Sequence, residues 1–114
     1  MDTYKSTVQA RITDSASAFL TRGASNDLIA KLARLHNTSA SAVTVRLWVA
    51  ENDGGSVRTV ATDDQYQIAE LSVPAGDTVY VPLDDKLTAQ NDTIQALAST
   101  TNVVNIVVSY IEVS

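Results

Sequence analysis

The stretch Val43-Thr44-Val45-Arg46-Leu47-Trp48-Val49 decides the fold of this 114-residue chain. Apolar side chains occupy every second position, and Thr, Arg or Trp stands at each position between them. Successive side chains of a β-strand point to opposite faces of the sheet, so this spacing predicts a strand with one buried face. A helix would place its apolar residues three and four positions apart. The stretch therefore predicts a half-buried β-strand.

Further short apolar segments lie on both sides of this strand, and most are separated by turn-forming Gly, Pro, Asn or Asp. They lie at residues 8–12, 18–20, 57–60, 69–73, 79–83, 94–98 and 103–113. Closely spaced turns between short alternating segments are typical of sandwiches. The sequence predicts an all-β, antiparallel β-sandwich, either immunoglobulin-like or a jelly roll, with about eight or nine strands.

The segment from Leu28 to Leu35 is open to two interpretations. Its leucines and isoleucine recur at spacings that a helix would use, and Asp27 could serve as the N-cap. An isolated helix of this length is only marginally stable in water. We therefore predict a strand here and keep the short helix as the alternative.

Two turn motifs carry specific expectations. Asn52-Asp53-Gly54-Gly55 supplies residues that tolerate positive φ, and it predicts a hairpin whose return strand is Val57 to Val60. Gly76-Asp77-Thr78-Val79 is echoed by Asn91-Asp92-Thr93-Ile94. Asparagine is the residue after glycine that best tolerates a left-handed backbone, so we expect two equivalent joints between turn and strand.

Composition excludes several classes of protein. The chain has 13 acidic residues against 8 basic ones, a net charge of −5, so nucleic acid is a poor partner. It has no cysteine and no apolar run near the roughly 20 residues that cross a bilayer. We expect a flexible N-terminal arm at residues 1–7 and one β-sandwich domain at residues 8–114, made in the cytoplasm.

The sequence carries no recognisable catalytic, cofactor or metal motif. His36 is the only histidine, and no activated nucleophile accompanies it. Asp63-Asp64 and Asp84-Asp85 lack the alternating spacing of a calcium loop. We therefore predict that the chain is not an enzyme and binds no cofactor and no metal.

The most informative single residue is Trp48. Alternation places it with Thr44 and Arg46, opposite the valines of its strand. Trp and Arg are enriched at the centres of protein interfaces, so this face is a candidate subunit contact, to which Tyr80 and Tyr110 could contribute. The alternative is that a loop packs over Trp48, and the sequence does not distinguish the two.

Several phrases resemble small structural proteins of tailed bacteriophages. They are Leu35–Ala50, where an apolar strand ends in Asn-Thr-Ser and resumes as alternating Val and Thr, followed by Leu71–Thr78, Asn91–Ala96 and Thr101–Ser109. The resemblance covers roughly Phe19 to the C-terminus. Asn91 stands where such proteins commonly have glycine.

This resemblance implies a virion accessory protein of β-sandwich fold. The implied role is capsid decoration or cement, with the major capsid protein or other virion proteins as partners and a homo-oligomer, preferably a trimer, as the assembled state. A neck, tail or fibre module is the alternative. A further alternative is a carbohydrate-binding sandwich that stacks sugars on Trp48 and nearby tyrosines.

Overall fold

The computed structural model describes residues 2–60 and 64–113, and their regular secondary structure is β-strand, apart from one 3-10 turn. The elements are β1 (Thr3–Ser6), β2 (Ala10–Ile12), β3 (Ser17–Thr21), β4 (Leu28–Asn37), β5 (Val43–Ala50), η1 (Asp64–Tyr66), β6 (Gln67–Val73), β7 (Thr78–Leu87), β8 (Thr93–Ala98) and β9 (Val104–Glu112). The predicted all-β class is confirmed. In the described ranges η1 is the only helical segment, and it is too short to cross a membrane.

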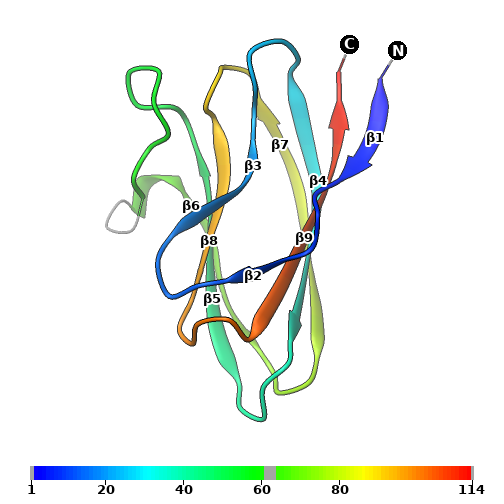
Figure 1. The fold of residues 1–114 in the computed structure, drawn as a ribbon, viewed down its shortest axis with the longest axis vertical. Helices are drawn as coiled ribbons and strands as arrows, with labels where there is room; N and C mark the ends of the chain where they lie inside the picture. The colour runs from blue at the N-terminus through cyan, green and yellow to red at the C-terminus, as the bar shows by residue number, and fades with distance from the viewer. Residues whose placement is uncertain (1, 61–63, 114) are drawn as a thin grey trace.

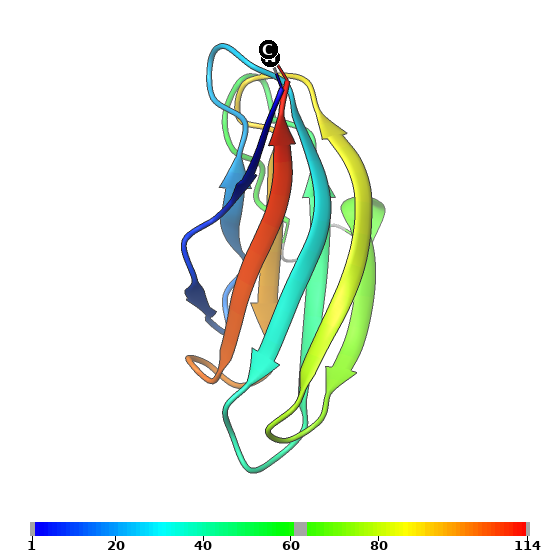
Figure 2. The same ribbon diagram turned by 90° about the vertical axis from the view of Figure 1, so that its right-hand side faces the viewer.

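The strands form two antiparallel sheets packed face to face (Figures 1 and 2). Sheet A has the order β1-β9-β4-β7, with β2 also pairing with β9, and sheet B has the order β3-β8-β5-β6. Among the described strands, β5 and β6 are the one pair that are neighbours both along the chain and within a sheet. Each connection after β6 runs from one sheet to the other. An immunoglobulin-like sandwich would pair several consecutive strands within one sheet. Of the two predicted sandwich types, this connectivity is that of the jelly roll.

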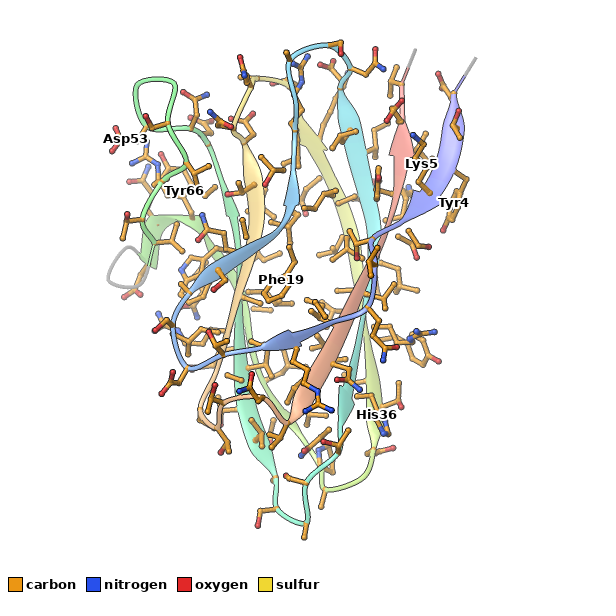
Figure 3. All side chains as sticks on the ribbon, in the orientation of Figure 1. Tyr4, Lys5, Phe19, His36, Asp53 and Tyr66 are labelled. Carbon is orange, nitrogen blue, oxygen red and sulfur yellow. The ribbon has the colours of Figure 1, made fainter. Side chains whose placement is uncertain are left out.

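The core lies between the sheets and is built from alternating apolar side chains. The β5 residues Val43, Val45 and Leu47 are fully buried, as their spacing predicts. The single phenylalanine, Phe19, packs against the same cluster from β3 (Figure 3). Burial of aliphatic side chains is worth about 1.5–3 kcal/mol each and is the main stabilising contribution of such a core.

The ambiguous segment at residues 28–35 is a strand, so the helical alternative is wrong. It forms most of β4, which lies between β7 and β9 in the middle of sheet A. The register shifts between Ala30 and Leu32, which marks a β-bulge. A bulge adds one residue to the strand and changes which positions face inwards. Across the bulge, the inward positions are three residues apart instead of two. This is why the apolar spacing of the strand resembles that of a helix.

The turn at residues 52–55 forms as predicted, but the return strand does not. Asp53 bridges to Ser56, and Gly54 and Gly55 have φ values of 59° and 90°. Residues 57–60 form no strand, and the hairpin partner of β5 is β6. Alternation alone cannot distinguish a paired strand from an extended segment that crosses a sheet. Of the acidic pair Asp63-Asp64, Asp63 lies outside the described residues.

The two predicted joints between turn and strand are equivalent. Gly76 has φ 67° and Asn91 has φ 70°, and each turn leads into the next strand, β7 or β8. The prediction that Asn91 adopts the left-handed backbone in place of glycine is confirmed.

The N-terminal segment predicted as an arm contains a strand. Residues Thr3–Ser6 form β1, which pairs with β9, and all four of its residues are exposed. Lys5 donates to Glu112 at 3.1 Å, and Thr7 exchanges two hydrogen bonds with Val108 at 2.9 Å. The segment is thus held by backbone pairing and surface contacts rather than by the core. Its flexibility remains a prediction.

Candidate functional site: the outer face of sheet A

The five residues predicted as interface contacts lie in three different places. Thr44 and Arg46 are on the outer side of sheet B, and Trp48 is buried beneath a loop there. Tyr80 is on the outer side of sheet A, with 59% of its surface exposed. Tyr110 packs against the core from the inner row of β9. These five residues therefore cannot form one surface. That each of them is a contact residue remains a prediction.

Trp48 belongs to a second, small core on the outside of sheet B. It is fully buried with Ala50 and Val60, and Tyr66 and Leu97 pack against them. Of the two alternatives for Trp48, the structure shows the covering loop. A sugar cannot stack on a side chain with no exposed surface, so the proposed carbohydrate platform is wrong. In the sequence, the one indication of this loop packing is the apolar Val60, which follows the turn and is buried against Trp48.

Arg46 closes one side of this small core. Its guanidinium carbon lies 4.8 Å from the centroid of the Trp48 ring, within the range of a cation–π contact. The same guanidinium donates to Gln67 Oε1 at 2.9 Å and pairs with Asp64 at 3.0 Å. Arg46 is therefore engaged within its own chain, which explains why it is only half-exposed.

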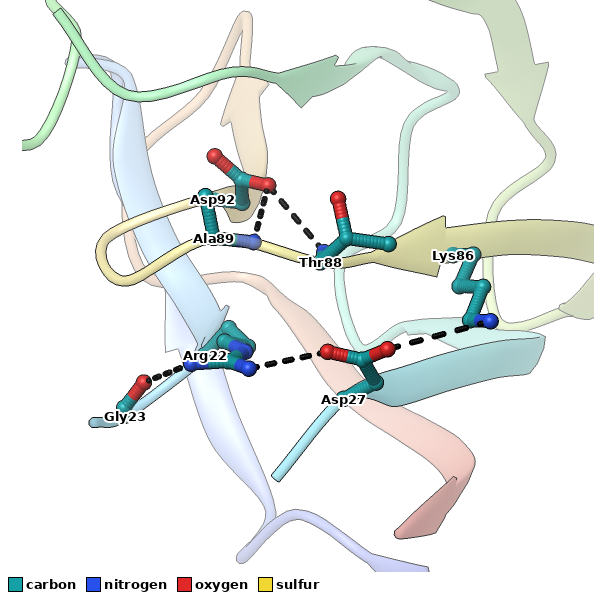
Figure 4. Close-up of polar contacts among 7 residues, drawn as sticks. All are labelled: Arg22, Gly23, Asp27, Lys86, Thr88, Ala89 and Asp92. Carbon is teal, nitrogen blue, oxygen red and sulfur yellow. Dashed lines mark hydrogen bonds and ion pairs between the residues drawn. The ribbon is translucent and has the colours of Figure 1, made fainter. Parts of the chain in front are cut away.

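Asp92 pins the covering loop to the end of the sandwich through Asn52, and Figure 4 shows its contacts with the turn at Thr88 and Ala89. One carboxylate oxygen accepts from the backbone and side-chain nitrogens of Asn52, at 2.9 and 3.1 Å. The other accepts from the backbone N–H groups of Thr88 and Ala89, at 3.2 and 2.9 Å. Burial acts to raise the pKa of Asp92, but these donors together outweigh it and hold the pKa below its ordinary value. Asp92 is thus a structural anchor for the loop.

The outer face of sheet A has no such cover. Figure 2 views the sheet from this side, and no described segment crosses in front of it. Cross-strand partners in a sheet point to the same face, so the register identifies the outward side chains. From one end of the strands to the other, the rows are Tyr4, Ile111, Ile29 and Lys86; Ser6, Ser109, Leu32 and Pro82; Val107, Arg34 and Tyr80; and Arg11, Asn105, His36 and Thr78.

Arg34 stands near the middle of this face. Its cross-strand neighbours are Val107 and Tyr80, and Leu32 precedes it in the next row along β4. Arg34 is exposed and forms no ion pair with any residue in the described ranges. An arginine and a tyrosine surrounded by aliphatic side chains make the composition of an interface hot spot. The sequence alone does not reveal this face, because it does not show which strands lie beside residues 28–35.

Charge is unevenly distributed between the two outer sides of the sandwich. The outer face of sheet A holds four basic side chains, Arg11, Lys31, Arg34 and Lys86, and one carboxylate, Asp84, which pairs with Lys31 at 2.9 Å. The outer side of sheet B and its covering loop hold Glu51, Asp53, Asp64 and Glu70 against Arg46 and Arg58. Figure 3 shows Asp53 and Tyr66 at one side of the molecule and Tyr4 and His36 at the other. In a chain of net charge −5, sheet A therefore presents a locally basic face.

Ion pairs fix the end of sheet A where the termini lie. Asp27 accepts from Arg22 at 2.8 Å and lies 3.7 Å from Lys86 (Figure 4). The hydrogen bond from Arg22 is the main cause that lowers the pKa of Asp27. The hydrogen bond from Lys5 likewise lowers the pKa of Glu112. These partly exposed pairs link neighbouring segments at the strand ends.

No reactive centre was found in the described part of the chain. His36 bonds through Nδ1 to Thr78 Oγ1 at 2.8 Å, near the end of β4. Within residues 2–60 and 64–113, no group of three or more His, Asp or Glu side chains is placed to hold a metal. A groove of about 430 Å³ between residues 14–18 and 57–60 has no aromatic lining residue. The outer face of sheet A is thus the surface that most resembles a functional site.

Comparison with known proteins supports the fold. No protein-family model and no curated protein sequence matches the chain. The chain is similar to a solved structure from Bacillus endospore appendages, described as disulfide-linked pili, with a TM-score of 0.55 and 12% identity over 100% of this chain and 87% of that chain. It is also similar to a chain of the T13 IBDV viral particle, with a TM-score of 0.44 and 7% identity over 98% of this chain and 31% of that chain. The likeness to the appendage protein shows a shared fold, and the phage resemblance remains a hypothesis from sequence.

Proposed function

We propose that this chain is a non-enzymatic structural protein of a bacteriophage particle, acting through protein–protein contacts as a capsid decoration or cement protein. The observation that carries the proposal is the uncovered outer face of sheet A, where Arg34 and Tyr80 stand among Ile29, Leu32 and Val107. An exposed tyrosine and arginine among partly exposed aliphatic side chains form a surface typical of contact sites with other proteins. The partners would be the major capsid protein, other virion proteins or further copies of the chain.

Other features support this role without depending on it. The phrases that resemble tailed-phage proteins run from about Phe19 to the C-terminus, and the fold is shared with an appendage protein that also belongs to an assembly. Jelly rolls occur widely in viral capsid proteins, although a fold by itself does not determine function. The chain has no cysteine, so disulfide linkage of the kind described for those pili is not available to it.

The test uses capsid shells that lack this protein. Purified chain should bind such shells and raise the temperature at which they break, because a lattice offers many equivalent sites. Arg34→Glu should bind more weakly. A matched control is the double variant Gln90→Glu/Thr101→Glu, which changes the net charge equally at two exposed turns and should bind normally. Shells that ignore the wild-type chain and are already heat-stable would refute the proposal.

A neck, tail or fibre position is the second candidate within the same class. It shares the supporting observations, since those positions also require contact faces rather than reactive centres. The number of copies per particle separates the two, because a lattice protein is present in far more copies than a tail protein.

A further inference from the structure

We propose that the partner of the outer face of sheet A is a second copy of this chain, which docks through the acidic outer side of its sheet B. This inference rests on the proposed function and names the contact that the structural role would use. The acidic side is defined as Asp64, Ile68 and Glu70, together with the covering loop that carries Glu51 and Asp53.

Charge complementarity favours this occupant. Arg34 and Arg11 on sheet A form no ion pair within the described chain, whereas Asp64 and Glu70 have 87% and 59% of their side-chain surface exposed. Asp64 and Glu70 do contact Arg46, but they leave most of their surface to solvent. Opposite charges across a contact select the partner and fix its register. A second copy carries the required acidic side by definition.

Apolar surface is present on both sides of the proposed contact. Tyr80 is exposed on sheet A, and Ile68 and Val57 are exposed on the acidic side, at 42% and 46%. Exposed apolar side chains ringed by charges resemble the core and rim of a protein interface. Burying Tyr80 and Ile68 would supply the hydrophobic part of the association, and the charges would supply its specificity.

The geometry of the sandwich determines how such copies would assemble. The two outer faces lie on opposite sides of the molecule, so each contact joins unlike surfaces and leaves one free face of each kind. Contacts between unlike surfaces produce a closed ring when the rotation from one copy to the next closes, and an open row when it does not. A three-membered ring would need the two faces to be inclined to one another by about 120°, because three equal wedges fill a full turn. The inference therefore favours rows of copies over the trimer predicted from the sequence.

The first measurement is the mass of the wild-type chain in solution, without shells, by sedimentation over a range of concentrations. The mass should rise past that of a dimer and fall back at high salt, because exposed charges are screened. Arg34→Glu and Glu70→Lys should each weaken association by roughly thirtyfold or more, the effect of losing a hot spot. The double variant Gln90→Glu/Thr101→Glu should associate like wild type.

Mixing the two variants is the decisive experiment. Each keeps one intact face and reverses the charge of the other, so in an equimolar mixture of Arg34→Glu and Glu70→Lys every contact between unlike variants joins opposite charges. The mixture should therefore regain the association that each variant alone has lost. The variant that carries both changes should regain association, since both charges are reversed. Circular dichroism and thermal unfolding of each variant verify folding, and Tyr80→Ser provides a second, uncharged test of the sheet A face.

The outcomes separate this inference from the proposed function. A wild-type chain that stays monomeric at all concentrations overturns the inference, even if it binds shells. Association that Arg34→Glu abolishes and Glu70→Lys leaves unchanged also overturns it, because sheet A would then pair with itself. Association as described by a chain that ignores shells would support the inference and refute the capsid role.

Discussion

The two outer faces of this sandwich are built from similar strands, but a loop covers part of one and no described segment covers the other. On sheet B, the loop after β5 folds back and buries Trp48 under Val60. On sheet A, Tyr80 is exposed and the aliphatic residues around Arg34 are partly exposed, with no loop over them. Both faces carry side chains that water solvates poorly, and only one is covered from within.

The difference between the two faces is what the proposed contacts account for. Covering an apolar face with a loop costs the conformational entropy of ordering that loop, and the gain on sheet B is burial of the only tryptophan. The proposed association would bury the face that is left open in the same molecule. Four predictions test this comparison.

The largest effect is expected from removing the side chain under the cover. Trp48→Ala should lower the free energy of unfolding by about 3–5 kcal/mol, because it leaves a cavity among Ala50, Val60 and Leu97. Chemical denaturation followed by far-UV circular dichroism measures this. Trp48→Phe, which keeps an aromatic ring, should cost clearly less. Unchanged stability in the alanine variant would mean that the cover contributes nothing.

Removing the anchor of the cover should have the next largest effect. Asp92→Ala leaves the donors of Asn52, Thr88 and Ala89 without their acceptor and should cost about 3 kcal/mol. The loosened loop should also shift the fluorescence of Trp48 to longer wavelength. Asp92→Asn retains one acceptor oxygen and should show a smaller change in both measurements. Equal behaviour of Ala and wild type would contradict the anchoring role.

Acid should weaken the same anchor. Because the pKa of Asp92 in the folded protein is below its ordinary value of 3.8, its contribution to stability is complete above that value and is lost as the pH falls through the lowered pKa. Trp48 fluorescence should report this loss in wild type. Asp27 and Glu112 also have lowered pKa values, so the comparison is with Asp92→Asn, in which the fluorescence change should be reduced.

The smallest effect on folding is expected on the open face. Tyr80 is mostly exposed, so Tyr80→Ser should change the free energy of unfolding by no more than about 0.5 kcal/mol. The same denaturation experiment measures this. A loss comparable to that of Trp48→Ala would show that Tyr80 supports the fold, and the contrast between the two faces would then fail.

The sequence predicted local structure where one strand or turn carries its own signal. Alternation identified β5, and positive φ values were predicted for Gly54-Gly55 and Asn91. The segment at residues 57–60 was mistaken for a return strand because its partner is determined by contacts far along the chain. A bulge in β4 imitated helical spacing for the same reason: strand geometry depends on neighbours that the sequence order does not reveal.

The candidate site was predicted only in part. Alternation correctly separated Trp48 from the core valines, but it could not show which outward faces a loop would cover. Tyr80 was named before its sheet was known. Arg34 was missed, since its importance comes from Val107 and Tyr80 on neighbouring strands rather than from any motif in β4. A surface formed from four strands becomes visible only when their register is known.

The position of the last strand has a consequence for how the chain is made. β9 lies inside sheet A, between β4 on one side and β1 and β2 on the other. On the ribosome, therefore, neither neighbour can complete its hydrogen bonds until residues 104–112 have emerged from the exit tunnel. Non-local pairing of this kind folds slowly, in milliseconds to seconds. A nascent chain that stalls before β9 would expose β4 as an unpaired edge, which makes incomplete chains prone to aggregation.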